Sequence, residues 1–152
     1  MLLIVDSIVL NLVGLIKMVT QRQMKFIDMV TEQAKETDPV DRSQHAAAVV
    51  IKNKVVGFGV NKYKTHPFQT KYGRNEDAIY LHAETSAIKD ALRTVSVEDL
   101  GRATLYVARV KKNRSHEYIN GMSKPCEGCE RCIADFGIKK VIYTTDEGVD
   151  IL

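Results

Sequence analysis

The sequence lacks most of the features that mark specialised chains. It has no tryptophan, no low-complexity run and no internal repeat, so repeat and compositionally biased architectures are excluded. With 45% hydrophobic and 27% charged residues over 152 positions, we expect one globular domain that is large enough to bury a core. A net charge of +3 is weak evidence for an anionic partner and far below the charge of a nucleic-acid-binding tail.

Cysteine is also scarce. The chain has three cysteines, an odd number, and two of them form the pair Cys126-x-x-Cys129. A disulfide framework would favour an even number spread along the chain. Metal-bound thiolates suit a reducing compartment better, so we expect a cytoplasmic protein.

The apolar run at residues 1–16 lacks the parts of a secretory signal, because no positive charge precedes it and no small-residue cleavage site follows it. A membrane span needs about 20 apolar residues, and Asp6 and Asn11 interrupt this run. Three interpretations stay open: a buried helix or oligomer interface, sequence upstream of a true start at Met18 or Met24, or a membrane or targeting element. We divide the chain into an apolar extension, 1–23, and a domain, 24–152, and expect no membrane partner.

Hydrophobic periodicity predicts alternating helices and strands. We expect helices at 20–35, 79–95 and 127–136, and strands at 46–51, 55–60, 103–108 and 139–144. A polar, irregular loop is expected at 62–77, and a basic loop or hairpin extension at 111–122, with no element assigned beyond 146. This order predicts an α/β fold, with three α/β/α layers around a mixed central sheet.

Two short motifs carry the chemistry: His82-Ala83-Glu84 and Pro125-Cys126-Glu127-Gly128-Cys129. One histidine and two cysteines are three ligands for a tetrahedral Zn²⁺, and the open fourth position is typical of catalytic zinc. Glu84 is the natural acid and base beside a water at that position. Because helical residues turn by about 100° each, His82 and Glu84 can share a site only near the start of their helix.

Other interpretations of the cysteines compete with this one. Cys132 could complete a purely structural site with four ligands, but Glu84 would then have no role. An iron–sulfur site lacks its fourth cysteine and the proline that follows it. We interpret Cys132 as a small core residue, because free cysteine behaves as a hydrophobe.

The pattern H-x-E…P-C-x-x-C resembles the cytidine/deoxycytidylate deaminase superfamily, whose signature it is, over about residues 40–145. The resemblance implies the three-layer fold. It also implies a zinc-bound hydroxide that attacks the amidine carbon of cytosine while Glu84 shuttles protons, which makes the protein a hydrolase acting on C–N bonds. Conversion of dCMP to dUMP is the expected reaction. Members of the superfamily often carry a further helix and strand after the last motif strand, and here only about eight residues remain.

The resemblance also suggests substrate contacts. It implies that Asn61 contacts the sugar and that the Ser123 backbone meets the exocyclic amine. His66, Lys64, Lys71 and Arg74 are loop candidates for sugar or phosphate. His45 is interpreted as a strand-edge histidine and His116 as a solvated loop histidine.

Several alternatives to a nucleotide substrate stay open. They are a free nucleoside or base deaminase, a tRNA or single-stranded nucleic acid deaminase, and a zinc-stabilised binding module without turnover. The basic run at 111–114 is interpreted as a solvated face, so a nucleic-acid partner is not favoured. We expect a homo-oligomer and no second zinc.

Overall fold

The computed structural model describes residues 18–73 and 80–152. Most of the predicted extension 1–23, and Arg74, lie outside these residues. The elements are α2 (Gln21–Lys35), β1 (Gln44–Ile51), β2 (Lys54–Val60), β3 (Lys62–Thr65), α3 (Pro67–Tyr72), β4 (Tyr80–Leu81), α4 (Ala83–Ala91), α5 (Val97–Leu100), β5 (Thr104–Lys112), β6 (Tyr118–Gly121), α6 (Glu127–Asp135), β7 (Lys140–Thr144) and β8 (Val149–Ile151).

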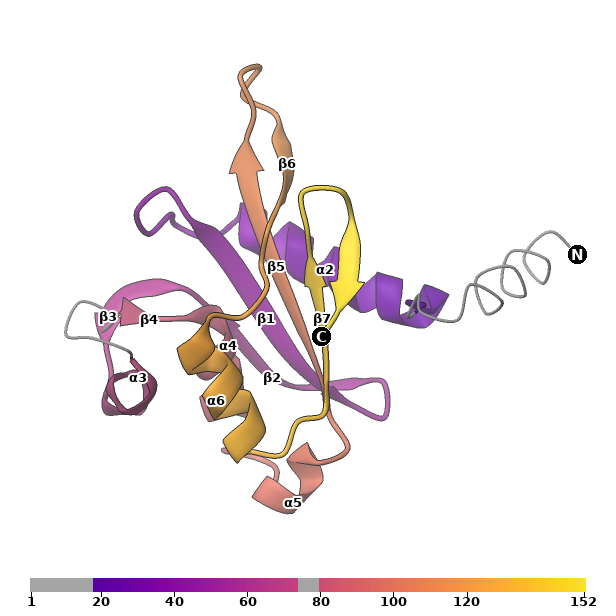
Figure 1. Ribbon diagram of the computed structural model, residues 1–152, viewed down its shortest axis with the longest axis vertical. Coiled ribbons are helices and arrows are strands. Elements are labelled where there is room, and N and C mark those ends of the chain that lie inside the picture. Colours follow the sequence, from indigo (N-terminus) through magenta and orange to yellow (C-terminus); the bar gives the residue numbers. More distant parts are fainter. Residues whose placement is uncertain (1–17, 74–79) are drawn as a thin grey trace, which may run out of the picture.

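A mixed sheet forms the middle layer, as predicted (Figure 1). Its strand order is β2-β1-β5-β7-β8, with β6 paired to the far half of β5. Among the described strands, β5 and β7 alone run parallel, since the chain returns between them through α6. Strands β3 and β4 form a separate two-stranded sheet.

Helix α2 covers one face of the sheet (Figure 1). It begins with a capping box, in which the Thr20 hydroxyl accepts from the Gln23 N–H and the Thr20 N–H donates to Gln23 Oε1. Ile27 and Val30 are fully buried against β1 and β5. Because a helix of this length is marginal alone, this packing stabilises it. The predicted boundary at residues 23/24 falls inside the helix.

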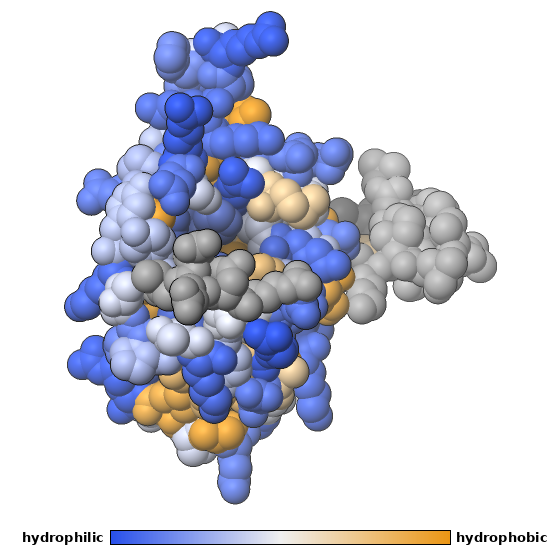
Figure 2. Space-filling model, turned by 60° about the vertical axis from the view of Figure 1, so that its left-hand side comes forward, coloured by the Kyte–Doolittle hydropathy of each residue, from blue (hydrophilic) through white to orange (hydrophobic). Residues whose placement is uncertain are grey.

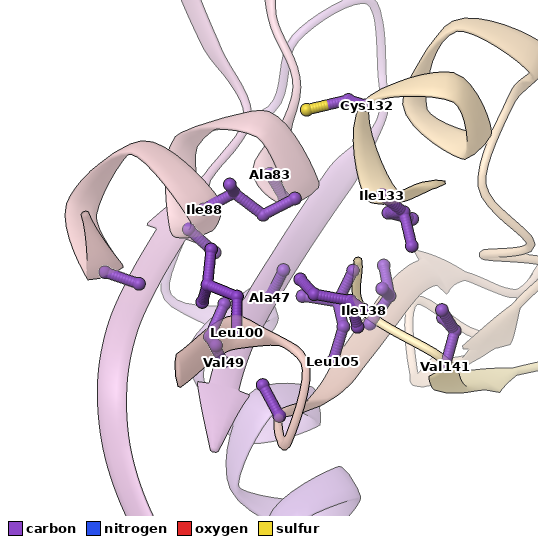
Figure 3. Close-up of a cluster of buried hydrophobic side chains, with 14 of the residues drawn as sticks. Ala47, Val49, Ala83, Ile88, Leu100, Leu105, Cys132, Ile133, Ile138 and Val141 are labelled. Carbon is purple, nitrogen blue, oxygen red and sulfur yellow. The ribbon is translucent and has the colours of Figure 1, made fainter. Parts of the chain in front are cut away.

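The opposite face of the sheet is covered by α4, α5 and α6, and their side chains interlock with the strands in Figure 3. Successive residues of β1 point to alternate faces. Ala46, Ala48 and Val50 pack toward α2, whereas Ala47, Val49 and Ile51 join the cluster on the α4 side. This parity decides which β1 residues can reach the far side of the sheet.

Two glycines of β2 allow α4 to lie directly on the sheet. A Cβ on Gly57 would be 2.3 Å from the Ala87 carbonyl oxygen, and one on Gly59 would be 2.5 Å from the Ala87 nitrogen. A helix backbone occupies the space beside both glycines, and the pairing of β1 with β2 shifts register next to Gly57. This contact sets the depth of α4 and of the residues at its start.

Several boundaries correct the predictions. The first motif helix, predicted at 79–95, covers Ala83–Ala91. It begins later than predicted because β4 precedes it. The stretch predicted as an irregular loop contains β3 and α3, and β8 follows the last predicted strand. The first hairpin turns at Lys52 and Asn53, where φ is +48° and +62°, the left-handed geometry of a two-residue turn.

The predicted extension at 111–122 is a hairpin of β5 and β6. It projects beyond the other strands in Figure 1, and its tip is largely hydrophilic in Figure 2. Lys111 pairs with Asp146 at 2.8 Å, and the Lys112 ammonium lies 5.0 Å from the ring centre of Tyr118. In the part of the chain that is described, no helix is long and apolar enough to cross a membrane.

We predict that Gly57→Ala destabilises the protein by about 3 kcal/mol, the upper end of overpacking effects, because backbone atoms of α4 cannot move aside. Gly101→Ala is the control, since its Cβ would meet only the Glu98 carbonyl oxygen at 3.2 Å. Urea denaturation measures both. Equal midpoints for Gly57→Ala and the wild type would show that α4 does not lie on β2 as described.

Candidate metal centre

His82 stands at the N-cap of α4. Its backbone is extended, with φ −79° and ψ 157°, and its side chain makes no capping hydrogen bond. The ring turns toward α6 instead, so that Nδ1 lies 3.3 Å from Cys129 Sγ and 3.6 Å from Cys126 Sγ. The helix start therefore presents its histidine to the second motif.

The two cysteines occupy the first turn of α6. Cys126 is the N-cap, and its sulfur accepts from the Cys129 N–H at 3.5 Å, the role that a serine or aspartate oxygen commonly has. Pro125 precedes this cap, and Gly137 follows the helix with φ +73°, the left-handed conformation that commonly ends a helix. Both sulfurs consequently lie on the side of α6 that faces His82.

The spacing of the three donor atoms fits zinc. The ligand atoms of His82, Cys126 and Cys129 all lie within 4.8 Å of one another. Bond lengths of about 2.3 Å to sulfur and 2.0–2.1 Å to nitrogen place tetrahedral ligands about 3.5 Å apart, which agrees with the 3.3 and 3.6 Å observed. Three converging donors of this kind could hold a zinc ion and leave a position open.

The three donor groups shift one another's pKa values. Hydrogen bonds from Cys129 and His82 lower the pKa of the Cys126 thiol to about 3. The same contact with Cys126 raises the pKa of His82 and, together with burial, raises that of Cys129. The set thus shares protons among three donors, and a metal ion that binds there would displace them.

Glu84 lies in the first turn of α4, two residues after His82. Its side chain is 5% exposed, and burial raises the pKa of its carboxyl group, partly opposed by the His82 charge. A buried carboxyl whose pKa moves toward neutrality can both take up and release a proton. As the sequence analysis required, both residues share a site because His82 precedes the first helical residue.

A cavity of about 390 Å³ opens onto these groups, within the range of small-molecule sites. His82, Glu84 and Cys126 line it together with residues of neighbouring strands, of the connecting segments and of the start of α4. Those residues are Val40, Asp41, Ser43, His45, Asn61, Tyr80, Leu81, Ala83, Ser123 and Lys124.

The three predicted substrate contacts have different surroundings. Asn61 lines the cavity, but its amide is tied to β1, since it accepts from the His45 N–H at 2.9 Å and donates to the Ser43 carbonyl at 2.8 Å. Ser123 also lines it, with its hydroxyl donating to the Val107 carbonyl at 2.9 Å. His66 is not on the cavity wall; its Nδ1 caps α3 by accepting from the Phe68 N–H.

His45 lines the cavity, whereas its position in the sequence predicts a strand-edge histidine. It shares the face of Ala47 and Val49, so it points to the α4 side and lines the cavity. Its Nδ1 lies 2.8 Å from Ser43 Oγ. The alternation along β1 indicates this place once the side of the sheet that α4 covers is known.

Cys132 lies away from the three donors. It is fully buried and belongs to the core cluster on the α4 side of the sheet. Burial raises the pKa of its thiol to about 12. Its interpretation as a small core residue is confirmed, and His116 lies exposed in the hairpin, also as predicted.

Comparisons with known proteins agree with this geometry. The family profile of the cytidine and deoxycytidylate deaminase zinc-binding region matches residues 20–145. The dCMP deaminase of cyanophage S-TIM5, solved in complex with dCMP and dUMP, is similar with 20% identity and a TM-score of 0.57 over 85% of both chains. Cytidine deaminase from Mycobacterium leprae is 17% identical, with a TM-score of 0.50 over 82% of this chain and 88% of that one. No curated protein matches the chain.

We predict that Cys129→Ala weakens zinc binding by more than about 100-fold, because it removes a ligand rather than a supporting group. Cys132→Ala is the matched control: it shortens the other buried cysteine of α6 and should leave one zinc per chain. Elemental analysis and competition with a chelator measure both. Loss of zinc from Cys132→Ala at unchanged stability would favour the closed, four-ligand site.

We also predict that the His45 ring titrates near pH 4, since burial, the Arg109 charge and the His82 charge, in that order, lower its pKa from 6.5 to about 4. The unfolded chain then binds protons that the folded one does not, so stability falls as the pH drops from 6.5 toward 4. NMR titration of the ring signals, assigned with His45→Gln, measures the midpoint. A midpoint at 6.5 or above would contradict the buried, neutral ring.

Proposed function

Because the chain belongs to the cytidine and deoxycytidylate deaminase family, we propose that it hydrolyses the amino group of a cytosine nucleotide, with dCMP converted to dUMP. The observation that carries this proposal is the meeting of three metal donors, two thiols and an imidazole, with a buried carboxyl at one cavity. A purely structural zinc site would have no use for that carboxyl.

We assign His82, Cys126 and Cys129 as the zinc ligands. Zinc bound there would supply a water made nucleophilic near neutral pH. Glu84 would accept the proton from that water, donate it to the ring nitrogen of the base and then assist the departing amine. Its raised pKa suits a group that must take up and release a proton within one cycle.

The position of Asn61 on the cavity wall supports a sugar-binding role for its amide. Its hydrogen bonds to Ser43 and His45 hold the amide rigidly at the wall, which reduces the entropy lost when a substrate binds. The Ser123 backbone, on the same wall, is assigned to the exocyclic amine. His45, which lines the cavity as well, joins them as a candidate substrate contact, and His66 stays a more distant candidate.

The nucleotide form of the substrate is supported by chemistry at the cavity mouth. Lys124 is exposed and lines the cavity, so it can meet an anionic phosphate. The similar cyanophage enzyme was solved with dCMP and dUMP.

Association of copies of the chain into a homo-oligomer, expected from the apolar start of the chain, stays a prediction.

We predict that Glu84→Gln lowers kcat for ammonia release by at least about 100-fold, the usual contribution of a general acid and base, while zinc stays bound. Glu98→Gln, at an exposed position of α5, is the control and should keep full activity. Retained turnover in Glu84→Gln at full zinc occupancy would overturn the assigned role of Glu84.

The substrate is tested with zinc-loaded protein on dCMP, deoxycytidine, cytidine, cytosine and an oligodeoxycytidylate. The proposal requires dCMP to have the highest kcat/KM. Preference for deoxycytidine or cytidine would make the protein a nucleoside deaminase. Silence across the panel with zinc bound would point to a binding module.

A further inference from the structure

The start of α4 has an unusual capping problem. In a capping box, the N-cap side chain accepts from the N3 N–H, and a glutamate or glutamine at N3 accepts from the N-cap N–H. Here the N-cap residue is His82, whose ring faces the cysteines and makes no capping bond. The N3 residue is Thr85, whose side chain is too short to reach back as an acceptor. The N–H of His82 therefore needs an acceptor from elsewhere.

Gln69 of α3 supplies that acceptor. Its Oε1 lies 3.1 Å from the His82 nitrogen and also accepts from the Thr85 hydroxyl. Gln69 is 1% exposed and Thr85 is fully buried, so water cannot substitute for this contact. A backbone N–H can only donate, so the amide oxygen of Gln69, and not its NH₂ group, must face His82.

Helix α3 is itself anchored to α6, the helix that carries the cysteines. The Tyr72 hydroxyl donates to Asp135 Oδ2 at 3.0 Å, and Arg131 Nη2 donates to the Tyr72 carbonyl oxygen at 2.8 Å. A Cβ on Gly128 would lie 2.3 Å from that same carbonyl oxygen, so the two helices touch through backbone. Gln69 is thereby held in register with Cys126 and Cys129.

We propose that Gln69 is a positioning residue for His82: it caps α4 from α3, which frees the His82 ring for the metal and aligns it with the two cysteines. The inference rests on the proposed role of His82 as a zinc ligand. It predicts that metal affinity depends on an amide that does not touch the metal, as outer groups that orient a ligand commonly affect affinity by about 10–100-fold.

The test compares three variants of the full chain. Gln69→Leu keeps the volume and removes the acceptor, whereas Gln69→Glu restores an acceptor oxygen at the same reach. Gln44→Leu is the matched control, because it makes the same substitution at an amide that donates to carbonyl oxygens at the end of α2, on the other face of the sheet from α4. Zinc affinity is measured by chelator competition, the geometry by the visible spectrum of the Co²⁺ form, and stability by urea denaturation.

We expect Gln69→Leu to weaken zinc binding by at least about 10-fold and to alter the Co²⁺ spectrum, and Gln69→Glu to recover most of the affinity. Gln44→Leu should lose stability but less than about threefold in zinc affinity. If Gln69→Leu does not fold, Thr85→Val, which releases one partner of the amide, should weaken zinc binding by a few-fold.

Wild-type zinc affinity and Co²⁺ spectrum in Gln69→Leu, at lowered stability, would overturn the inference and leave the proposed function intact. A wild-type protein that binds zinc but deaminates nothing would overturn the proposed function, and the affinities would still decide the role of Gln69. A wild-type protein that binds no zinc would overturn both.

Discussion

The convergence of two helix starts on one point is the constraint on which the rest of the structure depends. His82 is the N-cap of α4 and Cys126 is the N-cap of α6, so both ends present open N–H groups and the positive end of the helix dipole. That field favours thiolate over thiol. The sheet holds the two ends together, because α4 and α6 pack on the same face of it in one buried cluster.

The surrounding packing sets the distances at this point. Glycines in β2 let α4 approach the sheet until backbone meets backbone, and α3 joins the first turn of α4 to α6 through Gln69 and Tyr72. The donor atoms then lie at the separations that tetrahedral zinc requires. Glu84 reaches the same cavity because it is the second residue of a helix that begins just beyond the histidine.

Much of this could be predicted from sequence because its signals are local. The spacing of His82, Glu84, Cys126 and Cys129 identified the donor set, and periodicity identified α2, the first hairpin, α6 and the three-layer order. The start of α4 was misplaced because the apolar pattern runs back through Tyr80 and Leu81, which pair with β3 instead. Periodicity does not record such pairing.

What the sequence could not show depends on tertiary contacts. Helix α3 has six residues, too few to produce a periodic signal, and the partners of Gln69 lie 13 and 16 positions away. The place of His45 at the cavity follows from the parity of β1 only once the side occupied by α4 is known. The β8 strand has three residues and is defined by its pairing to β7 rather than by composition.

The most direct test of the account is deamination of dCMP by the zinc-loaded protein in water enriched in oxygen-18. The account predicts dUMP that carries one oxygen-18 atom on the ring carbon that held the amine, with one equivalent of ammonia. Absence of dUMP at full zinc occupancy, or dUMP without the label, would contradict hydrolytic deamination at the site formed by α4 and α6.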